Sequence, residues 1–419
     1  MSLVRVLAYI DPSFGSAMFA IALALANMAV LGVRALVSRV RTGSVVRVAS
    51  SEHMRCLVYS DSGRYFGTFG PILREFDRRG VEVTYWTQDA SDPLLGEGFE
   101  HVTCECIGDG PKAFGCLASV SCDIVLSTTP DLDVTQWRRS PFVGKYVHVM
   151  HCANTAAWYR MFGIDAYDVL LLANDYQVSE VRSLEEKRGF APKDLAVVGC
   201  PYMDELMVRV EREGHAGGTP HEVPVALVAP SWGDMGLLSR YGKRLVSGLV
   251  EAGFSVIVRP HPQSLVVERD LVEDIRAAFD GDCRVTWDFE PDNFASLDAA
   301  DVMVSDMSGV IHDFALVFDK PVLYVLDGVD MSTYDAAWLD EQFFESDLFV
   351  DAGIRLRDED MDNVGTIARS AIENADALAQ RRAHARELCW AHRGESARLV
   401  VDHVMGLLPD AGDADSREI

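Results

Sequence analysis

The sequence predicts an α/β protein made of two strand–helix halves that face each other across a cleft. Short apolar strands alternate with helical segments between residues 52 and 212, and the alternation restarts at residue 223. The polar, glycine-rich stretch at residues 211–222 is typical of a linker. Because strand–helix alternation forms parallel sheets covered on both faces, each half is expected to contain one such sheet.

The first half, residues 52–212, contains a series of segments with the apolar or β-branched composition of buried strands. They are residues 55–60, 81–87, 122–128, 145–151, 168–174 and 195–200. Helical spacing of apolar residues occurs at 65–80, 176–188 and 202–212, and Gly80 supplies a helix stop. These elements predict a complete Rossmann-like domain.

The second half, residues 223–408, repeats the pattern. Strands are predicted at 223–229, 254–259, 301–305 and 321–326, and helices at 241–252, 266–279 and 308–318. A helical tail from about residue 361 to residue 407, interrupted near 392–394, is expected to close this second domain. The last residues, 409–419, have the polar composition of a disordered tail.

The first 43 residues differ in kind from the rest. Residues 15–33 carry no charged side chain, and Arg34, Arg39 and Arg41 follow at once. A helix of about 20 apolar residues spans a bilayer, and flanking positive residues favour the cytoplasmic side. We therefore expect residues 1–43 to anchor the protein in the cell membrane, with its domains on the cytoplasmic face. A secretory signal and a hydrophobic helix buried in the domain are the alternatives, although the charges of a signal would precede the apolar run.

The composition excludes some partners. The formal net charge is −26, so no global field attracts nucleic acid, and an anionic substrate needs a local positive pocket. Nine cysteines without repeated spacing favour a reducing compartment over a disulfide framework. Cys104 and Cys106 form a C-x-C without a second pair at metal-ligand spacing, so no metal site is predicted.

Polar side chains follow several predicted strands, at the edge where open α/β sheets bind ligands. His261 follows the strand at 254–259 and stands between two prolines, which fix the direction in which its ring leaves the strand. His151 ends the strand at 145–151 in the other half. The remaining candidates at strand ends are Asn154, Thr155, Ser231, Trp232, Gly233, Asp306, Ser308 and Gly309.

These candidates also fit structural roles. Either histidine fits a side chain bonded to a backbone carbonyl, and Asp306 with Ser308 fits an ordinary helix N-cap. Small residues at a helix N-terminus also bind phosphate, so the two interpretations are compatible. The segment DSGRYFG at 61–67 lacks the dinucleotide-binding fingerprint, and neither a P-loop nor a His-Glu-x-x-His motif occurs in the sequence.

Five motifs carry a resemblance to a known family. They are VHVMHCANTAAWYR at 147–160, VGCPYMDEL at 198–206, APSWGDMGLL at 229–238, RPHP at 259–262 and ADVMVSDMSGVIHDFALVFDKPVLYV at 300–325. In this order they resemble the CDP-glycerol glycerophosphotransferases, which prime and polymerise glycerol or ribitol phosphate chains of the teichoic-acid type. Three positions depart from the family pattern. Met150-His151-Cys152 replaces Trp-His-Gly, Tyr202 replaces a basic residue, and His312 replaces an aromatic one.

The resemblance implies a GT-B fold, in which the C-terminal domain holds the nucleotide donor and the N-terminal domain the acceptor. An acceptor hydroxyl attacks the phosphorus next to glycerol, and CMP leaves. The implied catalytic residues are His151 as general base, His261, and Asp306, which fixes its loop or the tautomer of His261. The implied phosphate- and nucleotide-binding residues are Ser231, Trp232, Arg259, Ser308, Gly309 and Val310. The motifs require neither a cofactor nor a metal.

The sequence therefore predicts an enzyme that transfers glycerol phosphate, or a related polyol phosphate, in the synthesis of a teichoic-acid-like or capsular polymer. The expected partners are CDP-glycerol or a similar CDP-polyol, a lipid-linked or polymer acceptor, and the bacterial membrane. Two alternatives stay open. One is a GT-B glycosyltransferase that uses a nucleotide sugar. The other is a catalytically inactive, membrane-tethered binding protein, because the motif around His151 is altered.

Overall fold

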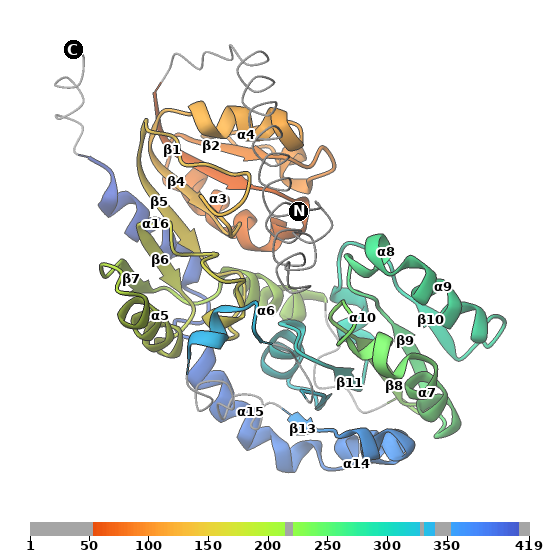
Figure 1. Cartoon of the computed structure of the whole chain (residues 1–419). Coiled ribbons are helices and arrows are strands. Elements are labelled where there is room, and N and C mark those ends of the chain that lie inside the picture. Colours follow the sequence, from red (N-terminus) through yellow and green to blue (C-terminus); the bar gives the residue numbers. More distant parts are fainter. Residues whose placement is uncertain (1–52, 214–220, 327–330, 340–352, 410–419) are drawn as a thin grey trace, which may run out of the picture.

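Two parallel sheets organise the chain into two lobes (Figure 1). The structure is a computed structural model that describes residues 53–213, 221–326, 331–339 and 353–409. The first sheet has the strand order β3-β2-β1-β4-β5-β6-β7 and the second has the order β10-β9-β8-β11-β12-β13, with every pairing parallel. Together with the similar structures reported below, this arrangement confirms the predicted GT-B fold.

The N-terminal lobe alternates strands and helices as expected. Its strands are β1 (Met54–Ser60), β2 (Val83–Thr87), β3 (Val102–Cys106), β4 (Cys122–Ser127), β5 (Val143–Val149), β6 (Val169–Leu172) and β7 (Asp194–Val197). Its helices are α3 (Phe66–Arg78), α4 (Gly110–Ser119), α5 (Asp175–Arg188) and α6 (Pro201–Glu213). Apolar clusters lie on both faces of this sheet, and β6 is buried along its whole length. Burial on both faces explains why its strands are continuous apolar runs.

The C-terminal lobe repeats the layering. Its strands are β8 (Val225–Ala229), β9 (Ser255–Val258), β10 (Val285–Trp287), β11 (Val302–Ser305), β12 (Val322–Tyr324) and β13 (Gly353–Arg355). Its helices are α7 (Leu237–Glu251), α8 (Ser264–Val267), α9 (Arg269–Ala278), α10 (Phe294–Ala299), α11 (Val310–His312), α14 (Val364–Glu373) and α15 (Ala375–Cys389). The sequence did not predict β3, β10 or β13, which are short or half-exposed strands at the sheet edges.

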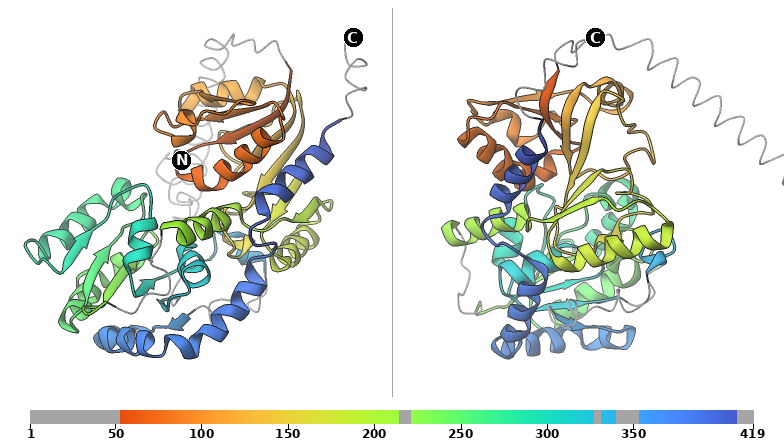
Figure 2. Two further views of the ribbon diagram at one scale, coloured as in Figure 1. Left: turned by 180° about the vertical axis from the view of Figure 1, so that it is seen from behind. Right: turned by 90° about the vertical axis from the view of Figure 1, so that its left-hand side faces the viewer.

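The last helix crosses back to the first lobe, which differs from the predicted boundary of 223–408 for the second domain. Helix α16 (Ser396–Leu407) packs against α3 and α6 (Figure 2). The chain turns at His392 and Gly394, both of which have positive φ. The buried Asp204 on α6 holds this turn, because its carboxylate accepts hydrogen bonds from Trp390 Nε1 and the Ser396 amide, each at 2.9 Å. Long-range contacts of this kind leave no local pattern in a sequence.

A second connection between the lobes lies close to the loop after β5. Residues 331–339 include the short helix η5 (Asp335–Trp338), and the Asp335 amide donates to the Tyr159 carbonyl at 2.9 Å. The buried Asp335 carboxylate accepts from the Phe162 amide at 3.0 Å and forms an ion pair with Arg188. The two lobes are therefore joined by polar contacts as well as by α6 and α16.

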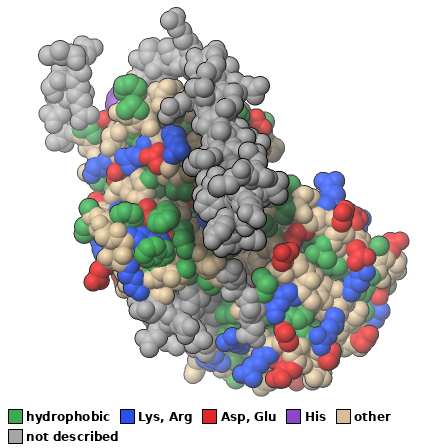
Figure 3. Space-filling model, viewed as in Figure 1, with side chains coloured by type: hydrophobic (Ala, Val, Ile, Leu, Met, Phe, Trp, Pro, Cys, Tyr) green, Lys and Arg blue, Asp and Glu red, His purple; other side chains and the backbone are tan. Residues whose placement is uncertain are grey.

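Several sequence expectations fall outside the described residues. The predicted membrane anchor at 1–43 and nearly all of the tail at 409–419 lie there, as do residues 214–220 of the linker. Within the described part of the chain, no helix has both the length and the apolar character needed to cross a bilayer. On the face that Figure 3 shows, acidic and basic side chains are interspersed over the C-terminal lobe, despite the net charge of −26.

Candidate active site between the two sheets

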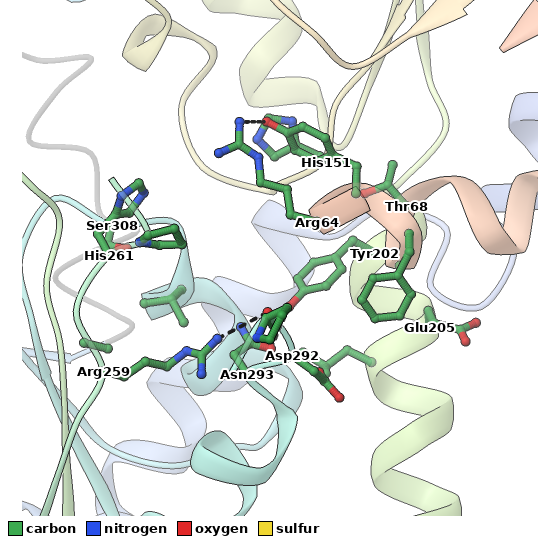
Figure 4. Close-up of a pocket in the computed structure, with 18 of the residues that line it drawn as sticks. Arg64, Thr68, His151, Tyr202, Glu205, Arg259, His261, Asp292, Asn293 and Ser308 are labelled. Carbon is green, nitrogen blue, oxygen red and sulfur yellow. Dashed lines mark hydrogen bonds between the residues drawn. The ribbon is translucent and has the colours of Figure 1, made fainter. Parts of the chain in front are cut away.

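A pocket of about 260 Å³ lies between the lobes, where the carboxyl ends of strands from both sheets meet (Figure 4). The N-terminal lobe contributes the loop after β1, the loop after β5 and the first turns of α6. The C-terminal lobe contributes the loops after β8, β9, β10 and β11. The structure thus brings His151 and His261 to one cavity, at the edge where open α/β sheets bind ligands.

His151 presents an unprotonated Nε2 to the pocket. Its Nδ1 lies 2.8 Å from Thr128 Oγ1, and the Thr128 hydroxyl donates its single proton to the Val149 carbonyl at 2.7 Å. The hydroxyl oxygen must then accept from His151 Nδ1–H, which leaves Nε2 as the acceptor. Burial, and secondly the positive charge of Arg64, lowers the pKa of His151 to about 4, so the ring is neutral at pH 7. Nε2 is therefore available as a base.

His261 holds the opposite tautomer. The Gln263 amide donates to its Nδ1 at 3.1 Å, so in the neutral ring the proton is on Nε2. Burial, and secondly the charge of Arg64, lowers the pKa of His261 to about 4. The ring is only partly buried, and this bond to a neighbouring backbone amide orients it. His261 therefore offers a hydrogen-bond donor to the pocket, whereas His151 offers an acceptor.

Asp306 supports the loop after β8 and does not hydrogen-bond to His261. Its buried carboxylate accepts from the amides of Ser231 and Leu237, each at 2.7 Å. Asp306 was expected either to fix its loop or to hold the tautomer of His261, and these two hydrogen bonds agree with the first role. Burial raises its pKa above the usual value, but the backbone donors act in the other direction. We therefore assign Asp306 a positioning role.

The predicted phosphate-binding residues divide between this pocket and a second cavity of about 420 Å³. Ser231, Trp232 and Gly309 line the second cavity, and Val310 lines the first. His261 and Ser308 line both, so the two cavities meet at these residues. The helix predicted at 308–318 is instead the single turn α11 followed by a π-helical turn, η4 (Asp313–Val317), a feature that often marks functional sites.

Arg259 lies at the C-terminal end of β9 and points toward the loop after β10 (Figure 4). Its guanidinium forms an ion pair with Asp288 and donates to the Glu290 carbonyl at 2.6 Å. Arg209 on α6 also lines the pocket and makes two bonds to Asp292, at 3.0 and 2.8 Å. Both arginines are therefore already paired with a carboxylate.

Sequence reasoning missed some lining residues on the N-terminal side. Tyr202, which departs from the family pattern, lines the pocket, and its hydroxyl donates to Asn293 Oδ1 at 3.3 Å. Arg64 lies in the loop after β1. In the sequence, this loop indicates only that the dinucleotide-binding fingerprint is missing. Its place directly after the first strand was the available signal. Among the described residues, no group of three His, Cys, Asp or Glu side chains is arranged to hold a metal ion.

Comparison with known proteins relates the chain to a family and a fold. A model of the family described as CDP-glycerol:poly(glycerophosphate) glycerophosphotransferase matches residues 152–406, a range that includes His261 and begins one residue after His151. A comparison with curated proteins gave no match.

Three similar solved structures illustrate the shared fold. The wall teichoic acid polymerase TagF is 13% identical, with a TM-score of 0.50 over 84% of this chain and 89% of that chain. A glycosyltransferase from Rickettsia africae is 11% identical, with a TM-score of 0.51 over 86% of this chain and 100% of that chain. The UDP-GlcNAc 2-epimerase from Neisseria meningitidis is 13% identical, with a TM-score of 0.52 over 84% of this chain and 100% of that chain.

Proposed function

Because the chain belongs to the CDP-glycerol:poly(glycerophosphate) glycerophosphotransferase family, we propose that it transfers glycerol phosphate, or a related polyol phosphate, from a CDP-activated donor to an acceptor hydroxyl. CMP is the leaving group. The observation that carries this proposal is the pair of opposite histidine tautomers in one pocket, with an acceptor at His151 Nε2 and a donor at His261 Nε2.

The pair matches the proton movements of the reaction. His151 Nε2 takes the proton of the acceptor hydroxyl as its oxygen bonds to the phosphorus next to glycerol. The bond from that phosphorus to the bridging oxygen breaks, and this oxygen leaves with CMP. His261 Nε2–H donates a hydrogen bond to the leaving phosphate. Such transition states involve little covalent work by the protein, so positioning and charge supply most of the catalysis.

The C-terminal lobe provides the groups that hold the diphosphate. Ser308 follows β11 at the junction of the two cavities, beside His261 (Figure 4). The Ser308 hydroxyl and the amides of Gly309 and Val310 bind phosphate oxygens, and Ser231 and Trp232 contact the donor from the loop after β8. Asp306 keeps that loop in place through the Ser231 amide.

We further propose that the acceptor is lipid-linked or polymeric and that the protein acts at the cytoplasmic face of the membrane. The uncharged run at 15–33, with Arg34, Arg39 and Arg41 after it, supports attachment to the membrane. The family description, which names poly(glycerophosphate), and the polymerase TagF among proteins of the same fold support a cell-wall or capsular polymer as the product.

A donor screen tests the proposal. Purified protein is incubated with CDP-glycerol, CDP-ribitol or UDP-sugars and a glycerophosphate-primed lipid acceptor, with the His151→Gln variant as the inactive control. Turnover of a CDP-polyol by the wild type alone is expected. Turnover restricted to a UDP-sugar would establish the glycosyltransferase alternative. Binding of CDP-glycerol without turnover in any combination would favour the inactive binding protein.

A further inference from the structure

Arg64 is the pocket arginine that has no carboxylate partner among the described residues. Arg209 is paired with Asp292, and Arg259 with Asp288, so their charges are largely compensated inside the protein. The guanidinium of Arg64 instead donates to the hydroxyl of the adjacent Tyr65 at 2.8 Å and lies 4.7 Å from the centre of that ring. The guanidinium of Arg64, which lines the pocket and has no carboxylate partner in the described part of the chain, is therefore available to bind an anion.

The backbone around Arg64 is held in place. Arg64 lies in the short helix η1 (Gly63–Tyr65) between β1 and α3, and the Arg64 amide donates to Ser62 Oγ at 3.3 Å. The Gly63 amide donates to Asp89 at 3.0 Å. A side chain added at Gly63 would come within 2.9 Å of the Asp92 backbone, so this turn is tightly packed. The fixed turn sends the Arg64 side chain toward the cleft.

Arg64 also lies within electrostatic range of both histidines. The Tyr65 ring is 5.0 Å from the His151 ring, and Figure 4 shows the Arg64 guanidinium beside His151, with His261 and Ser308 on the opposite wall. The charge of Arg64 contributes to the lowered pKa of His151 and of His261. One cation in the N-terminal lobe therefore acts on the reactive groups of both lobes.

We propose that Arg64 binds the phosphoryl group undergoing transfer, from the N-terminal side of the cleft between His151 and His261. The inference rests on the proposed function and adds to it a catalytic residue outside the five motifs. Planar guanidinium groups bind phosphate through two parallel hydrogen bonds, and negative charge spreads over the phosphoryl oxygens in the transition state. Since Ser308 and the amides after β11 approach from the other lobe, the phosphoryl group is then held from both sides.

Phosphate binding at Arg64 also explains how His151 acts as a base although its pKa is low in the pocket without donor. A histidine whose pKa is about 4 is a weak base at pH 7. A phosphate anion beside Arg64 compensates the guanidinium charge and itself favours the protonated imidazole, so it raises the pKa of His151 toward its ordinary value. The base is thereby strengthened only when donor is bound.

The test compares Arg64→Met, Arg64→Lys and the matched control Arg78→Met. Arg78 lies on α3, is exposed and pairs with Glu75, and neither residue lines the pocket. We expect Arg64→Met to lower kcat for CDP-glycerol about 10²–10³-fold, the usual cost of one lost transition-state donor. Arg64→Lys recovers part of this loss because it keeps the charge, and Arg78→Met retains wild-type kcat. Wild-type kcat in Arg64→Met, or an equal loss in Arg78→Met, overturns the proposal.

A binding measurement separates this inference from the proposed function. Calorimetric titration with inorganic pyrophosphate needs no turnover, so it applies even if the wild type accepts no CDP-polyol donor. Arg64→Met should bind pyrophosphate at least about tenfold more weakly than the wild type and Arg78→Met, the loss expected for one charge-assisted contact. Equal affinities in all three proteins would show that Arg64 is not a phosphate ligand. Melting temperatures near that of the wild type confirm that each variant is folded.

Discussion

Replacing His261 by asparagine should abolish most turnover and leave the fold nearly intact. The structure gives the ring one hydrogen bond with the protein, from the Gln263 amide to Nδ1 at 3.1 Å, and leaves it partly exposed. The asparagine oxygen takes nearly the place of Nδ1 and keeps this bond, whereas Nε2 has no counterpart. The stability loss should stay below about 0.5–1.5 kcal/mol, the net worth of one ordinary hydrogen bond. The loss of the hydrogen bond that Nε2–H donates to the leaving phosphate should lower kcat by about 10²–10³-fold.

The glutamine variant of the same residue tests whether the hydrogen bond donated by Nε2–H carries the role of His261. Its amide nitrogen reaches the place of Nε2 and donates a hydrogen bond there, but no atom takes the place of Nδ1 as the acceptor from the Gln263 amide. We expect more activity in His261→Gln than in His261→Asn, because the tautomer makes His261 a donor. CMP formation and melting temperature are measured for both variants. Full activity in His261→Asn, or a large melting shift with only a proportional loss of activity, would refute the assignment and make His261 a structural residue.

Three further predictions follow from the structure and the sequence. Thr128→Val removes the acceptor of His151 Nδ1–H and should lower kcat about tenfold or more, with little change in the Kd of the donor substrate. Side-chain ¹⁵N NMR should show the Nδ1–H tautomer of His151 in the wild type and its loss in the variant. An unchanged tautomer in the variant would contradict the assignment of His151 as the base. Burial raises the pKa of Asp313 to about 8, so its stabilising contribution, fully present below its usual pKa of 3.8, is lost as pH rises through 8. Asp313→Asn should therefore make stability fall less steeply between pH 5 and pH 8, by up to about 1.4 kcal/mol per pH unit, and an unchanged slope in urea unfolding would refute this. Deletion of residues 1–43 should release the protein from membranes in a flotation assay with cooperative unfolding retained, whereas an insoluble product without cooperative unfolding would place the segment in the core.

Much of the fold could be predicted because strands buried on both faces leave continuous apolar runs. Strand β6 is an example, since helices cover both sides of its sheet. Strands β10 and β13 have three residues each, too few for a periodic signal. The return of α16 to the first lobe depends on Asp204 meeting Trp390 and Ser396, and such a contact is invisible along the chain.

The candidate site was predictable to the extent that it lies at strand ends. His151 and His261 follow β5 and β9, and the parallel arrangement brings such loops to one edge of each sheet. Their tautomers were not predictable, because these depend on Thr128 and on the Gln263 amide. Arg64 was missed for a similar reason. Its role depends on the absence of a carboxylate partner among the described residues, and only the folded arrangement shows which arginines are already paired.

Identification of the nucleotide product tests phosphoryl transfer most directly. CDP-glycerol carrying ³²P in the phosphate next to glycerol is incubated with the wild-type protein and a glycerophosphate-primed lipid acceptor, and nucleotides and lipid are then separated. Phosphoryl transfer from the family's donor predicts unlabelled CMP in the nucleotide fraction and the label in the lipid, in equal amounts. Label recovered as CDP would contradict phosphoryl transfer, because it would mean that the bond between glycerol and phosphate breaks, as in a glycosyltransferase.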